Sequence, residues 1–302
     1  MDLKELHYII TIADEGSISG AAEKLYMAQS SLSQFLQQYE AEIGTPIFVR
    51  TSRGVRPTAA GSVFLSHIRQ IHLHYRRAQS ELWDIEEMPG GRIEFGISTF
   101  RGTYLLPRVL KRFYEIYPKV HVEITELDSV ELEERIMEGA LDMALIALPA
   151  VKLKNNVDFL MKDEIYIVAS GNHPVMKYVR KAEDGTPFVS FRDAAPFEFI
   201  LGPPQTILGM IARNEFKALG IPPYAPNQTA TASFAAAMAR AGIGLALTYR
   251  SCVVPEEGVE YLRIGKDGVY LDLGLVYPLG EYRSKAARKL GELMHGILGT
   301  PS

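Results

Sequence analysis

The chain has 302 residues, of which 47% are hydrophobic and 23% charged, and its formal net charge is −4. This composition excludes a disordered protein and predicts a soluble one of two or three domains. Its longest apolar stretches fall far short of the roughly 20 residues that a transmembrane helix needs, and its N-terminus does not resemble a signal peptide. The single cysteine, Cys252, excludes a disulfide framework and a multi-cysteine zinc site. We therefore expect a cytoplasmic protein without membrane contact.

The first 44 residues predict three helices joined by short turns. The first ends at Gly16, and Ser19 is expected to cap a short second helix. The third, over about 29–43, carries an apolar stripe: Leu32, Phe35, Leu36, Tyr39 and Ile43. Its opposite face is polar but almost uncharged: Ser30, Ser33, Gln34, Gln37 and Gln38. Because Gln and Ser can hydrogen-bond base edges, we interpret the second and third helices as a helix-turn-helix.

Positive charge gathers on the segment that follows. Between residues 43 and 80 there are six Arg, three His and no Asp or Glu. Residues 46–56 predict a short hairpin tipped by Arg53 and Gly54, a wing able to reach phosphates or the minor groove. Such a patch suits phosphate contact despite the net negative charge, and the alternative is a solvated helix face.

A long helix is expected after Pro57, with Thr58 as its cap. Its apolar residues repeat at alternating steps of four and three: Phe64, Ile68, Ile71, Tyr75, Ala78, Leu82 and Ile85. A period of 3.5 residues is typical of a coiled-coil seam and predicts dimerisation. The alternative is a helix that packs on its own domain.

A hinge is expected at 87–91, and beyond it strands and helices alternate. The run of strand, helix, strand, helix and strand over 92–148 predicts a parallel sheet with helices on its faces. A second similar unit follows over about 164–248, then a strand near 268–277 and a closing helix at 281–298. The fold class is therefore α/β with an all-α N-terminal part.

The N-terminal segment resembles the helix-turn-helix of LysR-type transcriptional regulators. The match is carried by Gly16-Ser17-Ile18-Ser19-Gly20-Ala21-Ala22, Leu25, Gln29-Ser30-Ser31-Leu32-Ser33-Gln34, Pro46-Ile47-Phe48 and Arg56-Pro57-Thr58-Ala59-Ala60-Gly61. Later segments also follow the family pattern: Leu105-Leu106-Pro107, Glu138-Gly139 and Ala241-Gly242-Ile243-Gly244. The resemblance extends over essentially the whole chain.

The resemblance implies a winged helix-turn-helix over 1–58, a linker and dimerisation helix over 59–88, and an effector-binding domain over 89–302. That domain would be periplasmic-binding-protein-like (type 2), with lobe I at about 91–162 and 268–302 and lobe II at about 163–267. The implied partners are double-stranded promoter DNA, a small-molecule effector, further copies of the chain in a homotetramer, and RNA polymerase. Activation and repression both fit.

Candidate DNA-binding residues come from the third helix and the wing: Gln29, Ser30, Ser31, Ser33, Gln34, Gln37, Arg50, Thr51, Arg53 and Arg56. The family commonly has a basic residue at position 34 and at least one near 37 and 38, where this chain has Gln34, Gln37 and Gln38. We therefore expect the wing arginines to make more of the phosphate contacts, and the operator to differ in detail from the family's usual site.

The resemblance places the effector between the lobes, where strands end and helices begin. By this comparison Ser98, Thr99 and Phe100 fall where the family holds its effector, Thr103 lies near the start of the following helix, and Ser129 matches a hydroxyl position. Second-lobe candidates are Leu201, Gly202 and Thr248, and each of these residues is alternatively a helix cap or part of the core. Arg101 is either a partner for an anionic effector or, as we expect, simply solvated.

An enzyme is not expected. We find no phosphate loop, paired-carboxylate motif or metal-ligand cluster, so we predict no catalytic residue, no metal and no cofactor. Cys252 is expected to be a buried small residue, and His72 and His74 point to different faces of one helix. A ligand-binding protein of the transport type, the other reading of the second domain, would not need residues 1–88.

Overall fold

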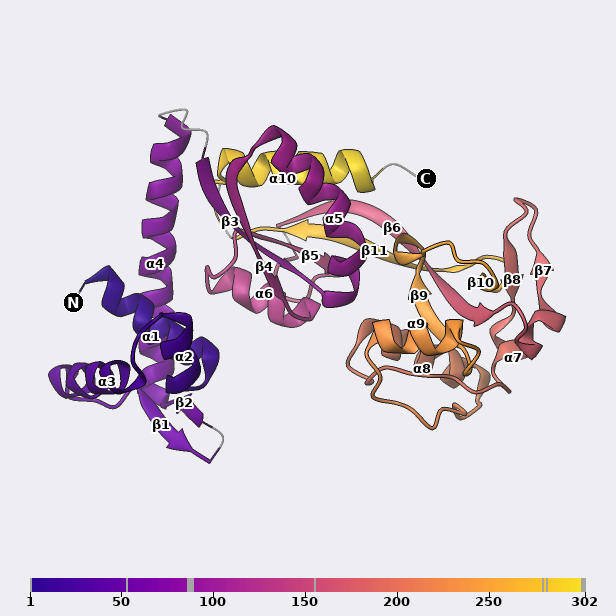
Figure 1. Cartoon of the computed structure of the whole chain (residues 1–302), viewed down its shortest axis with the longest axis horizontal. Coiled ribbons are helices and arrows are strands. Elements are labelled where there is room, and N and C mark those ends of the chain that lie inside the picture. The colour runs from indigo at the N-terminus through magenta and orange to yellow at the C-terminus, as the bar shows by residue number, and fades with distance from the viewer. Residues whose placement is uncertain are drawn as a thin grey trace.

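The structure is a computed structural model that describes residues 2–52, 54–85, 90–154, 156–278, 280 and 282–299. It forms a winged helical domain, a single long helix and a two-lobed α/β domain (Figure 1). No helix among these residues combines the length and the apolar character needed to span a membrane.

The N-terminal domain packs three helices and a two-stranded antiparallel wing around one core. Its elements are α1 (Leu3–Glu15), α2 (Ile18–Lys24), α3 (Gln29–Ile43), β1 (Phe48–Thr51) and β2 (Gly54–Pro57). Helix α1 ends at Gly16, which adopts the left-handed conformation (φ 58°) that glycine tolerates best. The cap of α2 is Ser17, whose side chain accepts from the Gly20 N–H, so the expected cap at Ser19 was wrong by two residues.

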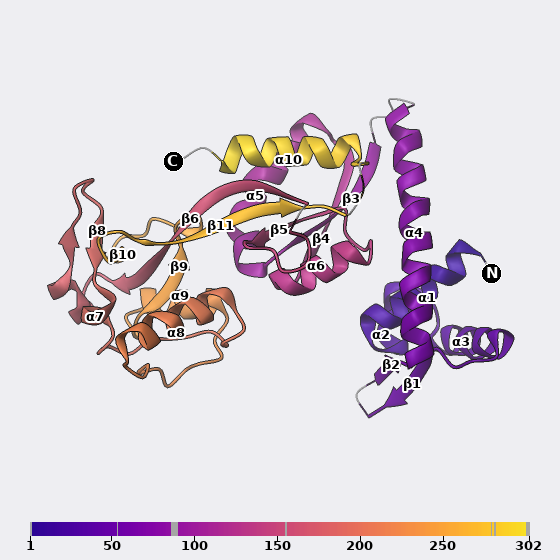
Figure 2. The same cartoon turned by 180° about the vertical axis from the view of Figure 1, so that it is seen from behind.

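Helix α4 (Ala59–Ile85) connects the two domains and lies along one side of the effector domain (Figures 1 and 2). Thr58 caps it as predicted, because its hydroxyl accepts from the Gly61 N–H at 2.9 Å. Leu65 and Ile68 belong to the core of the N-terminal domain. The first part of the predicted seam therefore packs on its own domain, whereas Ile71, Tyr75 and Leu82 are exposed.

The first lobe begins with the predicted βαβαβ unit. Its elements are β3 (Gly90–Ile97), α5 (Thr99–Ile116), β4 (Lys119–Glu126), α6 (Ser129–Met137) and β5 (Met143–Ala147). Strand β3 pairs in parallel with both β4 and β5. Helix α5 begins at Thr99, about one turn before the expected start, so residues 99–103 are helical rather than a loop.

Two long strands, β6 (Val157–Ser170) and β11 (Val269–Val276), run between the lobes as an antiparallel pair. The remaining elements are η1 (Pro174–Tyr178), β7 (Arg180–Lys181), β8 (Pro187–Val189), α7 (Phe191–Ala194), α8 (Ile207–Leu219), α9 (Ala232–Arg240), β9 (Ala246–Tyr249), η2 (Arg250–Cys252), β10 (Val259–Ile264) and α10 (Lys285–Leu298). The nine strands described for this domain form one sheet in the order β4-β3-β5-β11-β6-β10-β8-β7, with β9 paired to β6.

Each lobe has its own hydrophobic core. In the first, α5 and α10 cover the sheet, and Phe95, Phe113 and Leu290 are fully buried. The second core contains an aromatic cluster in which Phe191, Phe199 and Phe216 have ring centroids 4.9–5.5 Å apart. Because the lobes are separate bodies joined by crossing strands, a ligand can lie between them.

Candidate functional site

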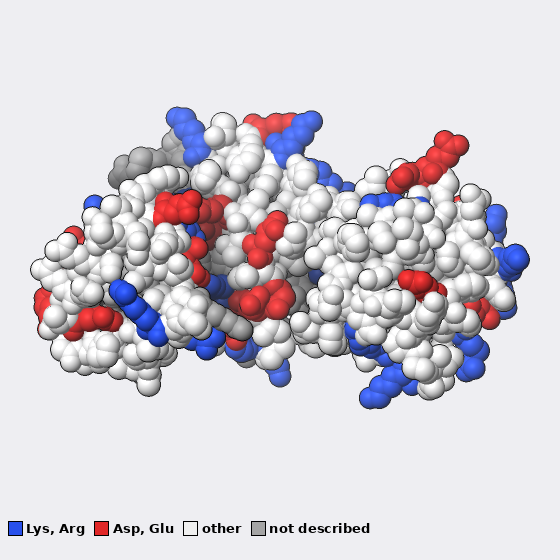
Figure 3. All heavy atoms as spheres, turned by 60° about the horizontal axis from the view of Figure 1, so that its bottom comes forward, with Lys and Arg blue, Asp and Glu red and all other residues white. Residues whose placement is uncertain are grey.

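The outward face of α3 is polar and exposed. Leu32, Leu36 and Tyr39 face the core, as the apolar stripe predicts, whereas Ile43 is 40% exposed. The exposed candidates are Gln29, Ser30, Ser31, Gln34 and Gln37, and Ser33 is half-buried. On the face that Figure 3 shows, the end of the molecule formed by this domain is mainly uncharged, with a group of acidic side chains at its outer edge and a basic side chain further in. Amide and hydroxyl groups are therefore displayed together on one helix.

The wing lies beside this helix. Arg50 Nη2 donates to Ser33 Oγ at 3.4 Å, so the strand β1 and the helix α3 share one surface. Thr51 and Arg56 are exposed, and the Thr51 hydroxyl donates to the Gly54 carbonyl. Arg53 lies outside the described residues. Tyr26, which the sequence analysis did not single out, is 98% exposed in the turn before α3 and has a positive φ of 53°.

Part of the basic segment faces inward and not toward solvent. Arg69 Nη2 lies 2.5 Å from Asp14 Oδ1, and Arg76 Nη2 lies 2.8 Å from Asp142 Oδ2. Both guanidinium groups neutralise carboxylates at the contact between domains, so they do not belong to a phosphate-binding patch. The positive segment is therefore divided between the wing and the contact between domains, because the net charge of a segment does not show which way its side chains point.

A cavity of about 550 Å³ lies between the lobes. This volume falls within the range of about 300–1,000 Å³ that is usual for small-molecule sites. Five of the eight candidate effector residues line it: Ser98, Phe100, Ser129, Leu201 and Gly202. The hydroxyl of Ser129 also accepts from the Ala147 N–H at 3.2 Å.

The other three candidates, Thr99, Thr103 and Thr248, lie outside the lining of this cavity. Thr99 and Thr103 are exposed on the outside of α5, and the Thr103 hydroxyl donates to the Thr99 carbonyl. Thr248 is buried in β9, where side chains alternate between faces. Its neighbours Leu247 and Tyr249 point to the cavity instead.

The cavity also takes Arg101, which the sequence analysis considered but expected to be solvated, and residues that it missed. The missed residues are Asp128, Val130, Ile200, Pro203, Gln205, Thr206, Ile207, Leu208, Thr229, Ala230, Thr231, Ala232, Ala235, Leu247 and Tyr249. Several of them begin helices α6, α8 and α9. A cap residue such as Thr206 or Thr231 before an apolar run was the sequence signal that could have found them.

Arg101 is buried, and the expectation that it is solvated was wrong. Its exposed fraction is 2%, and its guanidinium carbon lies 3.8 Å from the centre of the Tyr249 ring. Its Nε and Nη2 atoms have no hydrogen-bond partner in the described part of the chain. Because α5 starts early, Arg101 lies in its first turn and faces the second lobe.

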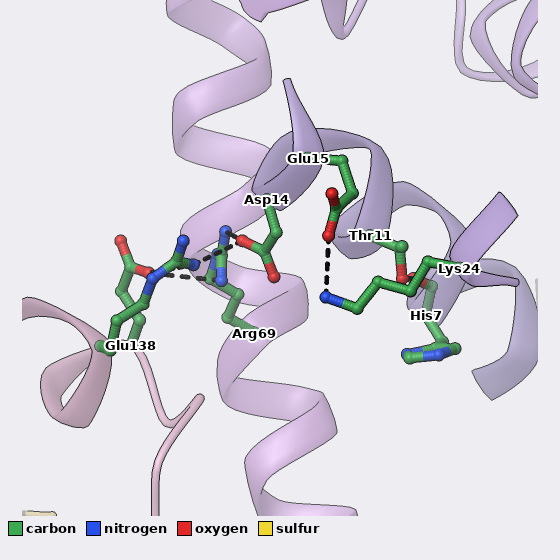
Figure 4. Close-up of polar contacts among 8 residues, drawn as sticks. His7, Thr11, Asp14, Glu15, Lys24, Arg69 and Glu138 are labelled. Atoms are coloured by element: carbon green, nitrogen blue, oxygen red, sulfur yellow. Dashed lines mark hydrogen bonds and ion pairs between the residues drawn. The ribbon is translucent and has the colours of Figure 1, made fainter. Parts of the chain in front are cut away.

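Helix α6 extends from the cavity to the N-terminal domain. Its first residues line the cavity, and near its other end Arg135 Nη1 lies 2.5 Å from Asp14 Oδ1. Asp14 also binds Arg69, and Arg69 Nη1 lies 3.3 Å from Glu138 (Figure 4). At Gly139 a Cβ would meet the Leu73 side chain at 2.6 Å, so glycine permits the close approach to α4.

Cys252 is buried, as predicted, and burial raises the pKa of its thiol to about 12. Within the described ranges, no three His, Cys, Asp or Glu side chains are grouped to hold a metal ion.

Comparison with known proteins agrees with this architecture. Residues 3–62 match the family model described as bacterial regulatory helix-turn-helix protein, lysR family, and residues 86–297 match the LysR substrate binding domain. The chain is 27% identical to the HTH-type transcriptional regulator YcgK of Bacillus subtilis (strain 168), over 97% of this chain and 94% of that protein.

Full-length LysR-type structures share the fold. A full-length OxyR variant from Pseudomonas aeruginosa aligns with a TM-score of 0.66 at 19% identity, over 100% of this chain and 99% of that one. CbnR in complex with its target DNA aligns with a TM-score of 0.65 at 19% identity, over 98% and 99% of the two chains.

A winged helix-turn-helix linked to a two-lobed ligand-binding domain defines a ligand-responsive DNA-binding regulator. The chain belongs to the LysR family of bacterial transcriptional regulators. It is a DNA-binding transcriptional regulator whose second domain is a LysR substrate binding domain.

Proposed function

We propose that the chain reads operator DNA with α3 and holds the phosphates with its wing. The base-reading set is Gln29, Ser30, Ser31, Ser33, Gln34 and Gln37, and the phosphate-binding set is Arg50, Thr51, Arg53 and Arg56. The observation that supports this assignment most directly is the exposed, uncharged polar face of α3 beside the wing arginine Arg50. Amide side chains pair with base edges, whereas guanidinium groups bind any phosphate. Because its target is promoter DNA, we infer that the protein acts in the cytoplasm.

We also propose that two copies associate through α4. An exposed stripe of Ile71, Tyr75, Ala78 and Leu82 on this helix supports the pairing, since apolar side chains at coiled-coil spacing gain from mutual burial. A dimer presents two α3 helices to two half-sites. The family resemblance favours a homotetramer and contact with RNA polymerase, and the proposal assigns the chain no catalysis and no cofactor.

The cavity between the lobes is the proposed effector site, and α6 is the proposed link to DNA. The lobe positions depend on what lies between them, and a shift of α6 is transmitted to Asp14 through the Arg135 ion pair. Effector binding thereby changes the placement of the N-terminal domains, and with it the spacing or bend of the bound DNA.

Two matched variants test the division of labour on DNA. Gln34→Ala should change the sequences recovered when the protein selects from random DNA, whereas Arg56→Ala should weaken binding to all sequences alike and reduce the salt slope by about one. An unchanged sequence preference in the Gln34→Ala protein would remove Gln34 from the base-reading set.

A further inference from the structure

The cavity is electrically asymmetric. Among the described residues that line it, Arg101 and Asp128 carry charge. The Asp128 carboxylate already accepts from the Val130 and Glu131 N–H groups at 2.9 and 3.0 Å, where it caps α6. Arg101 has no such partner for its Nε and Nη2 atoms, although 98% of the residue is withdrawn from solvent. The cavity wall therefore carries a positively charged group, Arg101, whose Nε and Nη2 donors are free to bind an anionic ligand.

The nearby carboxylate of Asp163 does not accept hydrogen bonds from these two Arg101 donors. Asp163 is buried, but one of its oxygens accepts from the Ser251 N–H at 3.0 Å and the other from the Ser251 hydroxyl at 2.6 Å. Burial raises the pKa of Asp163, and these hydrogen bonds and the charge of Arg101 act against that rise. Asp163 thus moderates the charge of Arg101, while the Nε and Nη2 donors of the guanidinium have no hydrogen-bond partner among the described residues.

The helix that carries Arg101, α5, adds to the positive electrostatic potential in the cavity. Four helices begin at the cavity, and in α6, α8 and α9 the side chains of Asp128, Thr206 and Thr231 accept from first-turn N–H groups. Helix α5 differs, because its cap residue Ser98 makes no side-chain hydrogen bond to the helix. Its first-turn N–H groups carry the positive end of the helix dipole and lie in the same turn as Arg101.

The rest of the cavity is mainly apolar. Phe100, Val130, Ile200, Leu201, Leu208 and Leu247 form much of its wall. A ligand that fits this wall needs an aliphatic or aromatic body, and one that satisfies Arg101 needs an acceptor group of negative charge. A planar carboxylate matches the fork of guanidinium donors best.

We propose that the effector is a small organic monocarboxylate whose carboxylate binds Arg101 and the first turn of α5, and whose apolar body lies against the second lobe. The proposal rests on the proposed function of the cavity as the effector site. It assigns Arg101 as the residue that selects acids over their neutral analogues.

The test uses matched probes and the full-length protein. Benzoate, cinnamate and hexanoate are compared with benzamide, cinnamamide and hexanamide, which keep the body and lose the charge. Binding is measured by calorimetry and by the shift in melting temperature. The variants are Arg101→Gln, its control Arg108→Gln on the exposed side of α5, and Ala232→Trp, which narrows the cavity at its rim.

We expect at least one acid of the panel to bind the wild type and Arg108→Gln, and its amide to bind at least about tenfold more weakly. Arg101→Gln should erase the preference for the acid, and Ala232→Trp should abolish binding of both. Without ligand, Arg101→Gln should melt close to Arg108→Gln, because loss of the contact with the Tyr249 ring is offset by removal of a buried charge whose Nε and Nη2 lack hydrogen-bond partners among the described residues.

Three results would overturn the proposal. They are equal binding of acids and amides, the absence of binding by every acid tested, and a lowered melting temperature confined to Arg101→Gln, which would make Arg101 a structural residue. Acid binding that survives both Arg101→Gln and Ala232→Trp would instead show that the cavity is not the binding site, and the proposed function would fail with it.

Discussion

His72 of α4 stacks on His7 of α1 with ring centroids 5.7 Å apart, at the contact between the linker helix and the N-terminal domain. Burial lowers the pKa of His72 to about 4, and the charges of Arg76, His7 and Arg92 act in the same direction. The folded protein therefore keeps this ring neutral, whereas in the unfolded chain it protonates near pH 6.5. Stability from this group is complete above about pH 6.5 and is lost as the pH falls toward 4.

Replacing His72 with Phe keeps the ring contact and removes the titration. The melting temperature of the wild type should fall more steeply between pH 6.5 and pH 4 than that of His72→Phe, and the two curves should run parallel above pH 7. Melting curves over this range measure the difference. Equal slopes for the two proteins would show that His72 is not held neutral in the folded state.

The residues of the cavity show which parts of a ligand site can be predicted from the sequence. Ser98, Ser129 and Gly202 were found because they follow strands in a recognised pattern. Thr248 was chosen because it was expected to end a second-lobe strand, but the alternation of β9 points its neighbours Leu247 and Tyr249 to the cavity. Arg101 packs against Tyr249, which is more than a hundred residues away in sequence, and no local pattern contains that information.

Among the elements, α6 connects the cavity with Asp14. We therefore expect Asp14→Asn to change both stability and the coupling between DNA and α6. Loss of the carboxylate charge removes the nearer of two carboxylates that Arg69 and Arg135 share, the other being Glu138, and should lower the free energy of unfolding by about 2 kcal/mol. Because coupling between sites is reciprocal, operator DNA should change amide hydrogen exchange in α6 of the wild type. That change should be lost in Asp14→Asn.

Glu15 offers a matched control. It follows Asp14 on α1 but pairs with Lys24 inside the N-terminal domain (Figure 4). Glu15→Gln should keep the response of α6 to operator DNA. If both variants respond as the wild type does, α6 does not transmit the signal through Asp14.

Element boundaries were predictable where a local signal marks them. Thr58 and Gly16 mark helix ends in the sequence and in the structure. The early start of α5 was not found, because Thr99 and Thr103 resemble loop residues and the helix is stabilised by packing of Phe100 and Leu105. The full length of β6 was also missed, since Lys162 and Asp163 interrupt its apolar pattern.

For the whole molecule, the exposed stripe on α4 predicts that Leu82→Glu weakens dimerisation at least about tenfold. Leu82 is 60% exposed in the single chain, and a charge there would be buried in the dimer. Val63→Glu is the control, because Val63 is 61% exposed on the same helix and lies off the stripe. Sedimentation over a concentration series measures both, and equal association of the two variants would place the dimer contact elsewhere.

The order of domains was predictable from sequence because each part has its own pattern: an uncharged polar helix face, a 3.5-residue repeat, and alternating strands and helices. The contact between the N-terminal domain and lobe I was not predictable, since nothing in the sequence distinguishes Asp14, Arg69 and Arg135 from ordinary surface charges. Only the fold brings these three side chains together.

Sequence-specific DNA recognition coupled to dimer geometry is the central claim, and a footprint tests it most directly. The full-length protein is bound to the DNA upstream of its own coding sequence, over a salt series and with excess random competitor. We expect protection of two half-sites related by two-fold symmetry that survives the competitor, because α3 reads bases while the wing holds phosphates. Protection that disappears with competitor and varies only with salt would contradict the account.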